Sequence, residues 1–80
     1  MTTYAVIRDG IDYGTIFEGV FLSRRGGEKM IMNNDRQFVS IIRSALDGSQ
    51  KKYIFTVDVE QKTMTRDDGT VFELREIETL

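Results

Sequence analysis

The 80-residue chain contains neither histidine nor cysteine. It therefore lacks the commonest general base at neutral pH, the thiol nucleophile and the ligands of ordinary zinc sites. Asp67, Asp68 and Glu73 could supply an acid pair or oxygen ligands for a metal ion. Their spacing does not match an EF-hand loop, and Asp67-Asp68-Gly69 is typical of a turn. The sequence therefore predicts a non-catalytic protein with no metal site and no cofactor.

Positive charge gathers in the turn that begins at Arg24, where Arg24, Arg25 and Lys29 lie close together. A charged hairpin tip can contact phosphates or enter a groove of a nucleic acid. The formal net charge of the whole chain is −2, which is unlike a typical nucleic-acid module. Nucleic-acid binding is thus the alternative function, and its candidate residues are Arg24, Arg25, Lys29, Lys51 and Lys52.

A second candidate surface combines acidic and apolar side chains. Residues 53–80 carry seven Asp/Glu against three Lys/Arg, whereas residues 1–52 carry six against eight. Apolar residues occupy both faces of the strand expected at Thr15–Ser23, with Phe17 and Phe21 on one face. Because aromatic residues are favoured at protein interfaces, this surplus indicates a protein contact. A strongly curved sheet that buries both faces is equally open. The candidate partner-binding residues are Glu73, Glu76, Glu78, Phe17 and Phe21.

One segment has the pattern of an amphipathic helix, from Asn34 to Gly48. Phe38, Ile41, Ile42 and Ala45 recur at helical spacing, and Val39 and Leu46 widen the apolar stripe. Asn34 can cap the N-terminus, and Gly48 can end the helix in a left-handed conformation. We expect this helix to lie across one face of a sheet.

The remaining chain predicts strands separated by turn signals such as Asp9-Gly10 and Asp67-Asp68-Gly69. The resulting element order is β-β-β-α-β-β-β. Tight turns favour antiparallel pairing, so we predict a single α+β domain over residues 1–80, with a curved antiparallel sheet. The expected strands are Thr3–Arg8, Thr15–Ser23 with a bend at Gly19, Lys29–Met32, Tyr53–Glu60, Thr63–Arg66 and Thr70–Ile77.

The stretch from Asp9 to Met32 resembles the first motif of Sm-like and other SH3-like small barrels. The matching residues are Gly19, at the middle of a bent strand in FEGVFLS, and Ile31, in the short apolar strand KMIM. The resemblance implies a curved, barrel-like sheet. The acid and asparagine of the Sm RNA-binding loop are missing where Arg24 to Glu28 stands, and the Sm helix precedes its barrel. No function is therefore transferred from this family.

Size and composition define the expected setting of the domain. A chain this small without disulfides often gains stability by association, which leaves a homodimer open. No segment has the ~18 consecutive apolar residues of a membrane span, and the N-terminus lacks a signal-peptide pattern, so we expect a cytoplasmic protein. The combined features favour a protein-binding module. Its format is that of a phage or mobile-element accessory protein that inhibits or modulates a host factor by occupying its surface.

Overall fold

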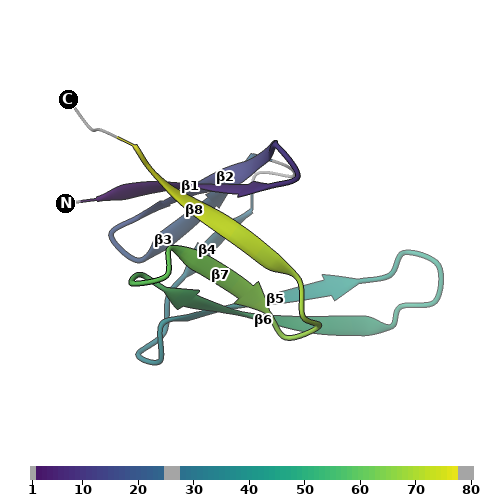
Figure 1. Cartoon of the computed structure of the whole chain (residues 1–80). Coiled ribbons are helices and arrows are strands. Elements are labelled where there is room, and N and C mark those ends of the chain that lie inside the picture. The colour runs from purple at the N-terminus through teal and green to yellow at the C-terminus, as the bar shows by residue number, and fades with distance from the viewer. Residues whose placement is uncertain (1, 25–27, 78–80) are drawn as a thin grey trace.

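The computed structural model describes residues 2–24 and 28–77, and all regular structure within these ranges is β-strand (Figure 1). The turn expected at Arg24–Gly27 lies largely outside the described residues. The eight strands are β1 (Thr3–Arg8), β2 (Ile11–Phe17), β3 (Val20–Ser23), β4 (Lys29–Ile31), β5 (Gln37–Arg43), β6 (Gln50–Asp58), β7 (Thr63–Arg66) and β8 (Val71–Ile77).

The strands form one antiparallel sheet in the order β4-β3-β2-β1-β8-β7-β6-β5. Strands β1–β4 make one meander and β5–β8 make a second, and the ladder between β1 and β8 joins them. The sheet curls into a nearly closed barrel, as Figure 1 shows. Within the described residues no ladder joins β4 to β5, so these two strands are the edges of the sheet.

The core lies inside the curled sheet and takes its side chains from the inner face of both meanders. Val6 on β1 and Leu74 on β8 are opposite each other and almost fully buried. Phe21 and Phe38 come from the two separate meanders, and their ring centroids are 5.9 Å apart. Apolar contacts between the two meanders therefore accompany the hydrogen bonds of the β1–β8 ladder. The buried cluster comprises Val6, Ile16, Phe21, Phe38, Val57, Met64, Phe72 and Leu74.

The helix predicted at Asn34–Gly48 is wrong, and with it the α+β fold. The segment forms a turn at residues 33–36, strand β5 and the loop 44–49 that leads into β6. Arg36 has φ 59°, which reverses the chain without a glycine that the sequence could signal. Phe38 is fully buried, whereas Leu46 is 99% exposed. The β-branched residues Val39, Ile41 and Ile42 favour a strand, and pairing with β6 decides the outcome.

The single long strand expected at Thr15–Ser23 is also wrong, because a tight turn divides it. Glu18 and Gly19 have φ values of 50° and 75°, as the two central residues of a type I′ turn require. Phe17 consequently pairs with Val20, and Ile16 pairs with Phe21. Gly19 therefore lies in a hairpin turn and not in a bent strand, so this detail of the resemblance to Sm-like barrels does not hold.

The far parts of β5 and β6 extend beyond the barrel as a two-stranded hairpin, which we call the arm (residues 41–52; Figure 1). The loop at its end is held by Asp47, whose Oδ1 accepts hydrogen bonds from the backbone N and the Oγ of Ser49 at 2.9 and 2.7 Å. Ile41, Ile42 and Leu46 are exposed along the arm. The arm thus places apolar side chains in solvent on a regular strand. Across residues 2–24 and 28–77, the structure has no helix that could cross a membrane.

Truncation of two apolar residues distinguishes the strand from the predicted helix. We expect Phe38→Ala to lower the free energy of unfolding by about 3–5 kcal/mol, because Phe38 fills the core. Leu46→Ala should change the free energy of unfolding by no more than ~0.5 kcal/mol, because its side chain is solvated. Urea unfolding of both variants measures the difference. Similar, large losses in both would indicate that Leu46 packs against a sheet, as the helix requires.

Candidate interaction surfaces

The outer side of strands β2, β3 and β4 presents a group of apolar side chains that we call the outer apolar face (Phe17, Val20, Leu22 and Ile31). Val20 lies opposite both Phe17 and Ile31 in the ladders, so the group is continuous across the three strands. Phe17, Leu22 and Ile31 are 41%, 52% and 72% exposed. A contiguous patch of large apolar side chains on a small domain is a feature of protein-binding surfaces.

Local turn geometry creates this face. The two-residue turn at Glu18-Gly19 places Phe17 and Val20 on the outside and sends Ile16 and Phe21 to the core. A hollow of about 290 Å³ lies over the outside of β2 and β3. Its lining is mainly apolar, with one acidic and one basic side chain, and consists of Thr15, Phe17, Glu18, Val20, Leu22 and Lys29. The hollow could accept one large apolar side chain of a partner.

The structure separates the two aromatic candidates of the sequence. Phe21 is 6% exposed and packs beside Phe38, whereas Phe17 lies on the outer apolar face. Their predicted common face is wrong because the intervening turn shifts the alternation of the strand. Sequence reasoning also missed Leu22 and Ile31 as members of the exposed group. The Glu18-Gly19 pair was the signal for the turn, and recognising it would have placed Leu22 beside Phe17.

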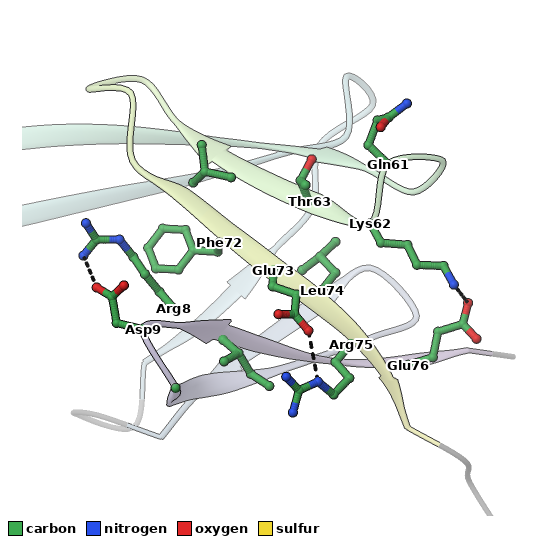
Figure 2. Close-up of a pocket in the computed structure, with 13 residues that line it drawn as sticks. Arg8, Asp9, Gln61, Lys62, Thr63, Phe72, Glu73, Leu74, Arg75 and Glu76 are labelled. Carbon is green, nitrogen blue, oxygen red and sulfur yellow. Dashed lines mark hydrogen bonds and ion pairs between the residues drawn. The ribbon is translucent and has the colours of Figure 1, made fainter.

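The acidic candidates Glu73 and Glu76 are both on β8, which borders a hollow of about 650 Å³ between the β1–β2 turn and β7 (Figure 2). Being three positions apart on one strand, they point to opposite faces of the sheet. Both carboxylates have basic neighbours. Glu73 is 3.0 Å from Nε of Arg75, and Glu76 is 3.3 Å from Nζ of Lys62. The charge of this strand is therefore partly balanced. Glu78 lies outside the described residues.

The basic candidates do not form one continuous surface. Nε of Arg24 contacts Oδ2 of Asp12 at 2.9 Å. Lys51 lies 5.1 Å from the ring centre of Tyr53 on the inner face of the arm, and the adjacent Lys52 points to the outer face. Lys29 borders the outer apolar face. Arg25 lies outside the described residues.

A charged cluster fixes the turn between β7 and β8 next to the base of the arm. The guanidinium of Arg66 contacts Oδ1 and Oδ2 of Asp68 at 2.9 and 2.8 Å, and it lies 4.7 Å from the ring centre of Tyr53. The hydrogen bond from Arg66, followed by those from Thr70, holds the pKa of Asp68 well below its usual range. Arg66 thereby connects the turn to strand β6.

No group of three or more acidic side chains that could hold a metal ion occurs in the part of the chain that the structure describes. Comparison with models of protein families, with curated proteins and with solved structures found no match.

The Arg66–Asp68 pair predicts a contribution to acid sensitivity. Because the pKa of Asp68 is lower in the folded chain, its stabilising contribution is complete above the unfolded pKa of about 3.9 and is lost as the pH falls through the folded value. Asp68→Asn should therefore lose less stability than the wild type between about pH 5 and pH 2. Urea midpoints across this range measure the effect.

Asp67→Asn in the same turn is the control, because Asp67 makes no ion pair with any described residue. It should follow the wild-type pH profile more closely than Asp68→Asn does. Equal profiles for the two variants would contradict the assignment of acid sensitivity to Asp68.

Proposed function

We propose that this chain is a non-catalytic protein-binding module that acts by covering a surface of a larger protein with its outer apolar face. The observation that carries the proposal is the exposure of Phe17, Leu22 and Ile31 on three adjacent strands. Burial of apolar area against a partner would stabilise a complex by about 25 cal/mol per Å² before the costs of association. Strands β2 and β3 are held in the hydrogen-bonded sheet, and a surface that is ordered before binding keeps those costs low.

The partner that fits this face has a projecting apolar or aromatic side chain for the hollow at Phe17 and Leu22, surrounded by polar groups. Glu18 and Lys29 at the edge of the hollow offer one charge of each sign for orientation. Glu73 and Glu76 contribute less to partner binding than the apolar side chains, because each already contacts a basic neighbour. Inhibition of a host factor by a phage-like accessory protein in the cytoplasm is one setting in which such a module would act.

Charge substitutions on the outer apolar face test the proposal. We expect Leu22→Lys and Ile31→Lys each to weaken capture of the partner by roughly tenfold or more, because each puts a charge into a desolvated contact. The measurement is a quantitative pull-down from a lysate of the source cell or its host, with and without nuclease. The melting temperature of each variant should stay within a few degrees of the wild-type value.

Val71→Lys is the matched control, because Val71 is about as exposed as Leu22 but lies on β8. It should capture the partner as the wild type does. If all three variants retain the same captured protein, the outer apolar face is not the binding surface. If all three lose it, the effect is one of general charge and the proposal also fails.

Nucleic-acid binding is the second candidate, and the arm offers one observation in its favour. Arg43 lies opposite Gln50, next to the pair Ile41–Lys52, so Arg43 and Lys52 are neighbours on the outer face of the arm. A two-stranded ribbon with basic side chains can lie in a groove. The cations of the arm thus make a better phosphate-binding group than Arg24, which already contacts Asp12.

Salt dependence decides between the two classes of partner. For the nucleic-acid candidate, affinity for a labelled duplex should fall steeply with added salt, and Arg43→Ala with Lys52→Ala should reduce the slope of log K against log salt by about 2. Fluorescence anisotropy measures both quantities. Undetectable binding of DNA and RNA at low salt would remove this candidate.

A further inference from the structure

Hydrogen bonds at the start of β5 show which of its backbone groups face β6 and which face the opposite side. At Gln37 the backbone N donates to Oδ1 of Asn33 at 3.0 Å, and the carbonyl oxygen accepts from the Asn33 backbone N at 2.9 Å. Both groups of Gln37 therefore point away from β6. Because the direction alternates along an antiparallel strand, Phe38, Ser40 and Ile42 bond to β6, whereas Val39, Ile41 and Arg43 face the open edge.

The hydrogen bonds of β6 give the same alternation. The backbone N of Val57 donates to the carbonyl of Arg36 at 2.9 Å, and the carbonyl of Ile54 accepts from Asp67 on the opposite side of β6. Odd-numbered residues of β6 thus face β5, and even-numbered residues face β7. At the open edge, Val39, Ile41 and Arg43 present three N–H groups and three carbonyl groups that no described strand pairs.

Apart from strand β4, which contacts β5 without forming a ladder with it, this edge lacks the usual protection against pairing with another strand. Edge strands normally carry lysine, proline or a bulge, or are very short. Strand β5 is seven residues long, has a regular register with β6, and contains no proline and no charged residue before Arg43. Val39 and Ile41 leave 40% and 61% of their surfaces in solvent. The short strand β4, at the other edge of the sheet, has only three residues.

We propose that the open edge of β5 pairs with the same edge of a second copy of this chain, antiparallel and about a two-fold axis at Ile41. In this register Ile41 lies opposite Ile41 of the second copy, and Val39 lies opposite Arg43. All three edge-facing residues then form hydrogen-bonded pairs. In each pair, the two residues exchange two backbone hydrogen bonds. A shift by two residues in either direction leaves part of these groups without a partner.

Charge and side-chain chemistry favour a second copy over an unrelated strand. The two Arg43 side chains lie at opposite ends of the paired segment, four residues or about 14 Å apart, which exceeds the Debye length at physiological salt. The central contact joins two isoleucines, an apolar pair that suits adjacent strands. Because so short a ladder buries less than the ~1,200 Å² of a standard interface, the dimer should dissociate on dilution.

Cysteine cross-linking tests the register, since the wild-type chain has no cysteine. The two Cα atoms of a hydrogen-bonded antiparallel pair are about 5.5 Å apart, which is within the range of a disulfide. Ile41→Cys should therefore cross-link to a covalent dimer under mild oxidation. A mixture of Val39→Cys and Arg43→Cys chains, one of them tagged, should give mainly the mixed dimer. Val71→Cys, which is about as exposed but lies on β8, is the control and should cross-link much more slowly.

Sedimentation equilibrium provides the second measurement without covalent chemistry. The mass of the wild type should rise with concentration from 9.2 kDa towards twice that value. Ile41→Lys places two like charges opposite each other and should raise the dissociation constant by roughly tenfold or more, with an unchanged circular dichroism spectrum. A wild type that stays monomeric up to NMR concentrations, or Val71→Cys that cross-links as fast as Ile41→Cys, would overturn the proposal. Neither outcome bears on the outer apolar face, which is tested by capture of another protein.

Discussion

The ladder between β1 and β8 is the interaction on which the rest of the structure depends. Each four-strand meander is closed by local turns. Among residues 2–24 and 28–77, this is the only ladder that joins the first half of the chain to the second. Val6 and Leu74 lie opposite each other within it and are almost completely buried. Hydrogen bonds and core packing therefore coincide at one place, and they bring strands from the two ends of the chain together. This pairing is the least local in the sheet and costs the most loop-closure entropy.

Joining the meanders at β1 and β8 determines which surfaces remain open. A sheet curled around one core needs only its inner face for stability, and large apolar residues on the outer face have no structural partner. Phe17, Leu22 and Ile31 are such residues. The same arrangement leaves β4 and β5 as edges, and β5 continues past the barrel into the arm. The joining of the two meanders at β1 and β8 thus leaves both proposed contact sites accessible. These are the outer apolar face, for another protein, and the edge of β5, for a second copy of the chain.

Local signals in the sequence were sufficient for several elements. Strands Thr3–Arg8 and Thr63–Arg66 have the predicted bounds, and Asp9-Gly10 forms the predicted hairpin turn. The segment after Asn34 could not be assigned in this way, because Phe38, Ile41 and Ile42 fit both periods. Long-range pairing with β6 resolved the ambiguity, and such pairing has no local signature.

The candidate surfaces were predictable to a similar degree. The sequence correctly suggested a surplus of apolar residues on strands, and it included Phe17 among the candidates. It could not separate Phe17 from Phe21, since one two-residue turn changes which residues point inward. It also could not show that Glu73 and Glu76 each lie beside a basic side chain, because Lys62 approaches Glu76 only in the folded sheet.

Amide hydrogen exchange along β5 tests the central claim most directly, with the exchange carried out on dilute, monomeric protein and then quenched before the NMR measurement. A strand with one open edge predicts alternation. The amides of Phe38, Ser40 and Ile42 should exchange slowly because they bond to β6, and those of Val39, Ile41 and Arg43 should exchange rapidly. Consecutive protection without alternation from Phe38 to Arg43 would indicate a helix or a second paired edge, and would contradict an open strand at this position.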